Sequence, residues 1–146
     1  MMSKQSGQPG RTQVGGPVRI SIRSDSDIVV ARGKGRQLAA DLGFQSTESI
    51  LIATVISELA RNIVRYAKAG DIILEVAVNG AASGIVVTAR DDGPGIWNVE
   101  QALQVGYSTS GGLGLGLPGV RRLMDEFEIV SKAGEGTIVK TTKWKR

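Results

Sequence analysis

The chain has 146 residues, with 18 Lys and Arg against 14 Asp and Glu, which gives a formal net charge of +4. A chain of this length buries roughly two thirds of the surface that it exposes when unfolded, enough for one domain with its own hydrophobic core. It contains no Cys and no His, which excludes disulfide scaffolds, Cys or His zinc sites, thiol nucleophiles and Ser-His-Asp triads. Its chemistry must therefore use carboxylates, amides, hydroxyls and backbone groups.

Residues 1–17 are predicted to form a mobile leader, because they lack periodic hydrophobicity and contain four Gly and two Pro. A single domain is expected over residues 18–146. The sequence has no run of about 18 apolar residues and no apolar signal-peptide core. These features predict a soluble, cytoplasmic protein that does not bind membranes.

The positive charge is weak evidence for nucleic-acid binding, although the isoelectric point is about 9.7. Much of the excess Lys and Arg lies near the two ends of the chain, where a solvated basic tail is expected. The six aromatic residues are scattered, so the stacking platform typical of single-stranded nucleic-acid binding is missing. We therefore expect no nucleic-acid partner.

Hydrophobic periodicity predicts a strand and then a helix at the start of the domain. Apolar and polar residues alternate over residues 18–23, the pattern of a strand with one buried face. Residues 24–27 can cap a helix that continues to Gly43. Gly33 and Gly35 are expected to weaken the middle of this helix.

The second helix has the clearest pattern in the sequence. Ser46 is predicted to cap it, Glu48 suits its positive end, and Gly70 is predicted to end it. The predicted apolar stripe consists of Ile50, Leu51, Thr54, Val55, Leu59, Ile63 and Tyr66.

The second half of the chain predicts two strand pairs separated by two helices. In chain order, the predicted elements are strands over 71–79 and 84–90, a short helix from the cap Asn98 through Val105, a helix over 113–127, and strands over 127–132 and 137–143. The whole order predicts a two-layer α/β (α+β) sandwich. Its sheet is expected to be mixed, mainly antiparallel, and covered on one face by helices.

Glu58 and Asn62 are the first candidate site residues, because they lie four residues apart and so share one face of the second helix. An amide oxygen suits Mg²⁺ when phosphates and waters complete its coordination, and a carboxylate one turn away can accept a proton from a hydroxyl. The same two residues also fit the solvated rim of an amphipathic helix. The helix pattern alone leaves both interpretations open.

Two Gly-rich segments can bring a ligand close to the backbone. Residues 91–95 (Asp-Asp-Gly-Pro-Gly) follow a predicted strand, and a carboxylate there can accept the exocyclic amine of adenine; these residues are equally typical of a turn. Residues 111–117 alternate Gly with Leu just before a helix, and their N–H groups favour a triphosphate. The sequence has no P-loop pattern, and G-x-G-x-x-G at 114–119 lacks the buried strand of a Rossmann site.

Together, these segments resemble the ATP-binding boxes of the Bergerat-fold (GHKL) superfamily, which includes gyrase, Hsp90 chaperones, histidine kinases and MutL. The resemblance covers residues 18–145, with the boxes in the family's order. It implies the Bergerat ATP-binding fold with ATP and Mg²⁺ as cofactors. The residues that match the family's ATP-binding residues are Asn62, Asp91, Gly93, Gly95, Gly112, Gly114, Gly116 and Thr137.

The resemblance also implies a role for each box. Asn62 would hold Mg²⁺, and Asp91 with its two glycines would contact adenine. The glycines at 112–116 would bind the phosphates. Thr137, which follows Gly136, would close the adenine pocket.

Within the superfamily, the chain resembles the small bacterial serine/threonine kinases that control sigma factors. It has no phosphoacceptor His, and it is too short for the dimer gating of gyrase, chaperones and MutL. Residues 106–127, residues 56–67 (ISELARNIVRYA) and the closing Lys-Trp resemble the stressosome switch kinases in particular. That resemblance implies phosphorylation of Ser or Thr on STAS-domain stressosome proteins, followed by binding and activation of a PP2C-type phosphatase.

The expected mechanism assigns Glu58 as the base that accepts the proton of the substrate hydroxyl. A lid that orders around the γ-phosphate is predicted over Tyr107, Ser108, Thr109, Ser110 and Gly111. Two alternatives remain at this point: an anti-sigma-factor kinase, and a nucleotide-gated binding module with little catalysis.

Overall fold

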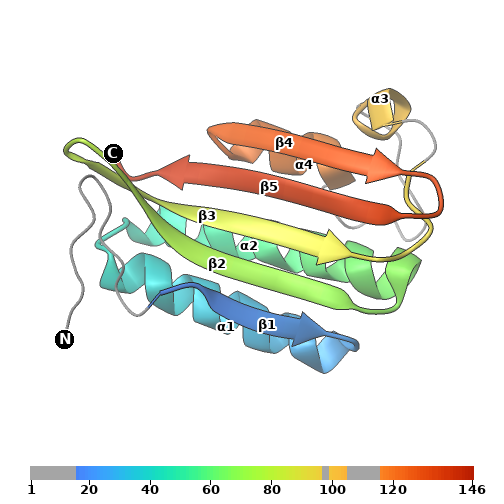
Figure 1. Cartoon of the computed structure of the whole chain (residues 1–146). Helices are drawn as coiled ribbons and strands as arrows, with labels where there is room; N and C mark the ends of the chain where they lie inside the picture. The colour runs from blue at the N-terminus through green and yellow to red at the C-terminus, as the bar shows by residue number, and fades with distance from the viewer. Residues whose placement is uncertain (1–15, 97–98, 105–115) are drawn as a thin grey trace.

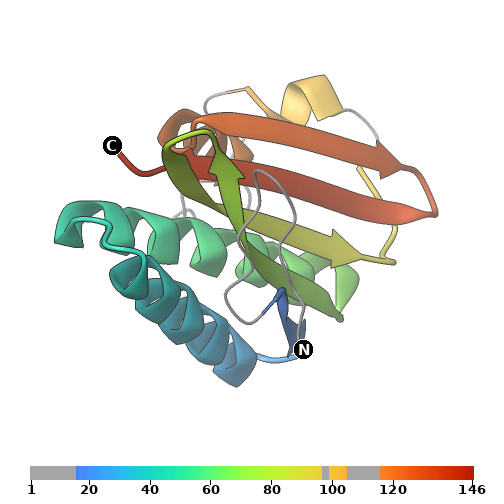
Figure 2. The same cartoon turned by 60° about the vertical axis from the view of Figure 1, so that its left-hand side comes forward.

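The computed structural model describes residues 16–96, 99–104 and 116–146, and it shows a five-stranded sheet with helices against one face (Figure 1). The strand order is β1-β2-β3-β5-β4. The elements are β1 (Val18–Ile22), α1 (Asp25–Asp41), α2 (Ser46–Asn62), the π-helical segment η1 (Ile63–Ala67), β2 (Gly70–Asn79), β3 (Ala82–Asp91), α3 (Val99–Ala102), α4 (Gly116–Leu123), β4 (Glu126–Lys132) and β5 (Gly136–Trp144). Figure 2 shows α1 and α2 side by side along the sheet. The predicted two-layer α/β sandwich is confirmed.

Every strand pairing among the described residues is antiparallel, whereas the sequence predicted a mixed sheet. Two helices, not one, join β1 to β2, so the chain re-enters the sheet at the end where β1 stopped. The strands β3 and β4 do run in the same direction, but β5 returns as a hairpin and lies between them. The topology therefore brings no two parallel strands into contact.

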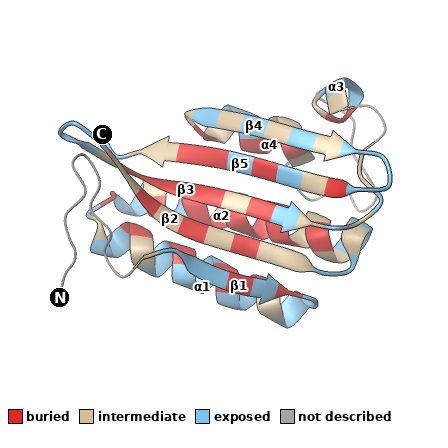
Figure 3. Cartoon of the chain, in the orientation of Figure 1, coloured by how far each residue is buried: buried red, intermediate tan, exposed pale blue. Residues whose placement is uncertain are grey.

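The hydrophobic core lies between the two long helices and the inner face of the sheet (Figure 3). Burial of each large aliphatic side chain contributes about 1.5–3 kcal/mol. The largest fully buried side chains are Ile22, Ile52, Ile56, Leu59, Ile63, Ile72, Leu74, Ile85, Val55, Val87, Val120 and Thr141.

The helix α1 is continuous, although two glycines lie in its middle. Its start agrees with the prediction, because the Asp27 carboxylate accepts the N–H groups of Arg23 (2.9 Å) and Ser24 (3.2 Å). Gly35 is buried at the contact with α2, and a Cβ there would overlap the Cδ1 atom of Ile56. Gly35 therefore lowers the local stability of α1 but allows α1 and α2 to approach each other closely.

The predicted limits and stripe of α2 are partly wrong. Gln45 is the N-cap, and Ser46 is the first helical residue. The helical segment ends at Ala67, because Gly70 pairs with Ile22 and Asp91 as the first residue of β2. Ile50 and Tyr66 are exposed, whereas Ile52 and Ile56 are fully buried. The stripe is rotated because α1 covers a second side of this helix.

The predicted helix over 113–127 is shorter in the structure. The described part of this helix, α4, covers Gly116–Leu123, and residues 113–115 lie outside the described residues. Phe127 belongs to β4, where it pairs with Thr141 of β5. The helix therefore ends at Leu123, and the last two predicted helical residues belong instead to β4, which pairs with β5.

Most of the predicted leader, residues 1–15, lies outside the described residues, as does Asn98. In the part of the chain that the structure describes, no helix is long and apolar enough to cross a membrane.

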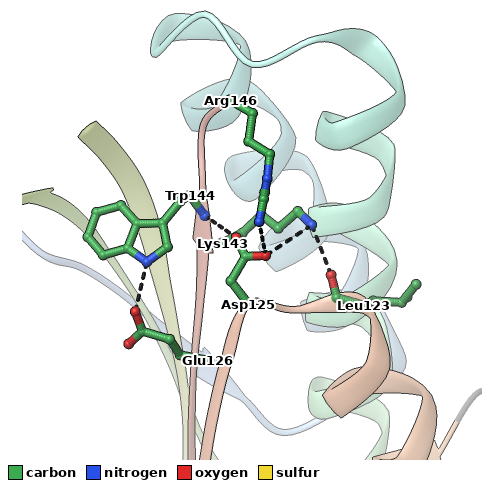
Figure 4. A network of polar contacts seen from close by, with 6 residues as sticks. All are labelled: Leu123, Asp125, Glu126, Lys143, Trp144 and Arg146. Carbon is green, nitrogen blue, oxygen red and sulfur yellow. Dashed lines mark hydrogen bonds and ion pairs between the residues drawn. The ribbon is translucent and has the colours of Figure 1, made fainter. Parts of the chain in front are cut away.

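Asp125, between α4 and β4, ties this connection to the end of β5 (Figure 4). Its carboxylate accepts the Trp144 N–H at 2.7 Å and an Arg146 Nη2 donor at 2.6 Å. Lys143 Nζ lies 3.8 Å from the same carboxylate and donates to the Leu123 carbonyl at 3.2 Å, at the end of α4. These contacts hold α4 against the sheet.

We expect Asp125→Asn to lower the free energy of unfolding by about 1–3 kcal/mol, because one oxygen acceptor and the charge are lost at a largely buried site. Urea denaturation followed by circular dichroism measures this change. The matched control is Glu126→Gln, which alters an exposed bond to Trp144 Nε1 and is expected to change stability by at most about 0.5 kcal/mol. Equal effects of the two variants would contradict the assigned role of Asp125.

Candidate functional site

A cavity of about 370 Å³ opens between the end of α2, the central strands and the start of α4. Five residues of the predicted site line it, although they come from distant parts of the sequence. The residues that line the cavity are Leu59, Asn62, Ile63, Tyr66, Ala67, Ala89, Asp91, Pro94, Gly95, Ile96, Gln101, Ala102, Gly116, Leu117, Thr137 and Val139. Asn62, Asp91, Gly95, Gly116 and Thr137 are therefore brought together by the fold.

Asp91 ends the central strand β3, where it pairs with Gly70 on one side and Thr137 on the other. Its Oδ1 atom accepts the Gly93 N–H at 2.8 Å, which fixes the orientation of the carboxylate. Burial raises the pKa of Asp91 above its ordinary value, and the charge of Asp92 raises it further. Backbone hydrogen bonds from Gly93 and Thr137 oppose that rise. The result is a carboxylate held rigidly at the cavity wall.

The two glycines after Asp91 meet different constraints. Gly93 does not line the cavity, and a Cβ there would lie 2.6 Å from the Cβ of Ala67. Gly95 has a φ of +78°, and a Cβ there would overlap the carbonyl oxygen of Lys132. Gly93 therefore permits packing on η1, and Gly95 brings bare backbone to the cavity.

Ser131 is a supporting residue that the sequence analysis missed. Its Oγ accepts the Ile96 N–H at 2.7 Å and lies 2.7 Å from the Thr137 Oγ1. The Pro94 carbonyl also accepts the Gly134 N–H at 2.7 Å. These bonds fasten the loop after Asp91 to the β4–β5 hairpin. A lone Ser in an alternating strand gave no signal of this contact.

Glu58 is buried beside the cavity but does not line it. Its Oε1 atom is 2.8 Å from Arg61 Nη1, and its Oε2 accepts the Gly116 N–H at 3.3 Å. Asn62, one turn later, does line the cavity. Of the predicted pair, Asn62 therefore lies in the cavity wall and Glu58 lies just outside it. Gly116, the first residue of α4, lines the cavity and also contacts Glu58.

Several predicted residues lie outside the described residues: Gly112, Gly114 and the lid residues Tyr107, Ser108, Thr109, Ser110 and Gly111. Gly116, the last glycine of that segment, opens α4 at the cavity.

The arrangement suits a ligand that has a flat polar ring and an anionic chain. Apolar side chains such as Ile63, Ala89 and Val139 provide walls for a ring, and Asp91 provides an acceptor. Asn62 provides a polar partner for an anion, and the positive N-terminal end of α4 favours negative charge there.

Comparison with known proteins identifies a family with this chemistry. Residues 47–145 match the family described as histidine kinase-, DNA gyrase B-, and HSP90-like ATPase. The chain is 49% identical over 127 residues to the serine/threonine-protein kinase RsbT of Bacillus subtilis (strain 168), covering 87% of this chain and 96% of RsbT. It is also 31% identical over 112 residues to the anti-sigma F factor of Thermoanaerobacter sp. (strain X514), covering 73% of this chain and 77% of that protein.

A solved structure has the same fold. The crystal structure of the RsbU and RsbW domains of Rv1364c from Mycobacterium tuberculosis matches with a TM-score of 0.57 at 22% identity, and the match covers 88% of this chain and 32% of that one. The chain therefore belongs to the family of histidine kinase-, DNA gyrase B- and HSP90-like ATPases, whose members use ATP. Within that family it is a serine/threonine-protein kinase similar to RsbT. The resemblance to the GHKL superfamily is confirmed.

The raised pKa of Asp91 predicts a pH dependence of stability. Because burial disfavours the charged form, the contribution of this residue to folding is greatest below its unfolded pKa and falls as the pH rises through its folded pKa. Asp91→Asn should therefore gain stability relative to the unaltered protein on going from about pH 4 to about pH 7. Urea denaturation at both pH values measures the difference. A relative loss over the same interval would show that the hydrogen bonds outweigh burial.

Proposed function

We propose that this protein is an ATP- and Mg²⁺-dependent serine/threonine kinase that phosphorylates STAS-domain stressosome proteins in the bacterial cytoplasm. The observation that carries the proposal is one cavity that joins Asp91, Asn62, Thr137 and the start of α4, with the buried Glu58 next to it. The relationship to RsbT supports the choice of protein Ser/Thr as the acceptor.

In the proposed complex, the adenine ring lies between the apolar walls, and its exocyclic amine donates to Asp91. Thr137 and the backbone at Gly95 complete that end of the cavity. The phosphates extend toward Gly116, where the N–H groups at the start of α4 favour negative charge. Gly112 and Gly114 belong to the same proposed phosphate loop, and Gly93 supports the adenine end through its packing.

The residues present fit a magnesium ion held jointly with ATP. In the described residues, no group of three or more Asp or Glu side chains forms a site for a metal alone. Asn62 therefore offers one amide oxygen, and the phosphates and waters must supply the other ligands. Bound Mg²⁺ neutralises charge on the triphosphate.

Glu58 is the proposed base, because its carboxylate lies against the Gly116 N–H, next to the phosphate end of the cavity. The substrate hydroxyl oxygen bonds to the γ-phosphorus, and the bond to the bridging oxygen of ADP breaks. The hydroxyl proton passes to Glu58, and ADP leaves with the bridging electrons. Phosphoryl transfer needs mainly positioning and charge stabilisation, so one carboxylate is sufficient as the protein's proton acceptor. Residues 107–111 remain the proposed lid.

We further propose that the protein, once released from its phosphorylated partners, binds and activates a PP2C-type phosphatase. The anti-sigma F factor similarity favours a second candidate, a kinase that also sequesters a sigma factor. Co-purification of a sigma factor with the tagged protein distinguishes this alternative. Activation of the phosphatase by an unaltered protein that transfers no measurable γ-phosphate to STAS-domain proteins would indicate a binding module that acts without catalysis.

Glu58→Gln is expected to reduce phosphotransfer by about 10²–10⁴-fold, because the proton acceptor is lost. Transfer of labelled γ-phosphate to purified STAS-domain proteins measures the rate, and calorimetry measures ATP affinity, which should change by less than about threefold since Glu58 lies outside the cavity lining. Glu128→Gln, an exposed site on β4, is the matched control. Transfer by Glu58→Gln at the unaltered rate would refute the assigned role.

Nucleotide binding should depend on Asp91 and Asn62 in different ways. Asp91→Asn is expected to weaken ATP binding about 10–100-fold with or without Mg²⁺, because a hydrogen bond to a charged group contributes about 1.5–3 kcal/mol. Asn62→Ala should weaken binding only when Mg²⁺ is present. Calorimetry with and without EDTA measures both effects, with the exposed neighbour Asp92→Asn as the control. Unchanged affinity in Asp91→Asn would place adenine elsewhere.

A further inference from the structure

A second hollow, larger than the first, lies between α1 and α2. This groove has a volume of about 560 Å³, and Glu58 is its one lining residue with a role in the proposed phosphotransfer. Figure 2 shows the two helices side by side, and the groove is lined by residues within 29–36 of α1 and within 50–61 of α2. Its most informative lining residues are Val29, Arg32 and Arg36 from α1, and Ile50, Glu58 and Arg61 from α2.

The groove is strongly basic. Three arginines line it, and its one acidic residue, Glu58, is already paired with Arg61. Neither Arg32 nor Arg36 takes part in an ion pair among the described residues. They lie one turn apart on α1, where two like charges destabilise a helix slightly. Both arginines are exposed, so their charges are available to an anionic partner.

Apolar surface accompanies this charge. Val29 is 55% exposed and Ile50 is 51% exposed, on opposite walls of the groove. Gly33 lies in the same lining, and a Cβ there would meet nothing within 4 Å. The packing of α1 on α2 therefore requires a glycine at position 35 but not at position 33. At position 33, a glycine destabilises the helix by about 1 kcal/mol relative to Ala, with no gain in packing. The bare backbone at Gly33 leaves room for a chain lying in the groove.

The groove also reaches the proposed base. Glu58 lines it, and Glu58 Oε2 accepts the N–H of Gly116, a residue of the nucleotide cavity. A chain lying between α1 and α2 would therefore reach Glu58 from the groove and place its hydroxyl between Glu58 and the phosphate end of the cavity, beside Gly116. Arg61 is the more exposed partner of the ion pair, since its side chain is 37% exposed against 8% for Glu58.

We propose that the groove receives an acidic segment of the acceptor protein that flanks the phosphorylated Ser or Thr, with an apolar side chain against Val29 and Ile50. A carboxylate of that segment draws Arg61 away from Glu58, which frees Oε1 to take the hydroxyl proton. This inference rests on the proposed kinase function. It also explains how the same ion pair restrains Glu58 from activating water while no acceptor is bound.

The first experiment measures binding and transfer with groove variants and an acceptor STAS-domain protein. Arg36→Glu and Gly33→Leu should each raise the KM for the acceptor at least about tenfold, by charge repulsion and by steric obstruction respectively, while ATP affinity stays unchanged. Lys34→Glu is the matched control, because Lys34 is exposed on α1 but does not line the groove. Replacement of acidic residues near the acceptor hydroxyl with Lys should impair the unaltered kinase and restore part of the activity of Arg36→Glu.

The second experiment tests the release of Glu58. Arg61→Gln should increase ATP hydrolysis without acceptor at least about threefold, while transfer to the acceptor falls, because the base is free but the acidic segment has lost a partner. A variant that merely disturbed the fold would lower both rates. A decrease in both rates in an Arg61→Gln variant whose circular dichroism spectrum and ATP affinity are unchanged would overturn the release step.

The outcomes separate this inference from the proposed function. If the unaltered protein transfers phosphate and the Arg36→Glu and Gly33→Leu variants do so with the same KM, the groove is not the docking site and the kinase function stands. If the unaltered protein transfers no phosphate, the proposed function fails, and the groove proposal fails with it.

Discussion

The packing of α2 between α1 and the sheet is the constraint on which the rest of the structure depends. The buried side chains of this helix include Ile52, Val55, Ile56 and Leu59. The absence of a side chain at Gly35 lets α1 approach α2 closely. One edge of the helix then lines the nucleotide cavity, and the other lines the basic groove. A shift or rotation of α2 would therefore displace Asn62, the proposed Mg²⁺ ligand, and Glu58, the proposed base, together. Glu58 is buried, and Asn62 is half-buried at the cavity.

The central strands provide the second fixed part of the site. Asp91 ends β3 between two paired neighbours, so its backbone is held on both sides. The pKa shift of Asp91 is consistent with this placement, since burial costs the carboxylate more than its backbone hydrogen bonds return. Such a group is poorly placed for stability alone. Its position in the cavity wall suits a hydrogen-bond acceptor for a donor group of a ligand.

Sequence reasoning predicted the order of the elements and five of the residues that line the cavity, because periodic hydrophobicity and Gly-rich boxes carry local information. It missed features that depend on contacts between distant segments. Ile50 fits a helical stripe, yet α1 leaves it exposed. Ser131 gave no signal, because its partners Ile96 and Thr137 are brought to it only by the fold. The position of Glu58 outside the cavity lining likewise depends on where α4 begins.

The central claim is that the nucleotide, bound in the cavity, and the acceptor, bound in the groove, meet at Glu58. A crystal structure of the protein with a non-hydrolysable ATP analogue, Mg²⁺ and a STAS-domain acceptor tests it most directly. The account predicts the adenine amine on Asp91, the γ-phosphate beside Gly116, and the acceptor hydroxyl within about 2.6–3.2 Å of Glu58. An acceptor hydroxyl held against another base, or a nucleotide outside the cavity, would contradict it.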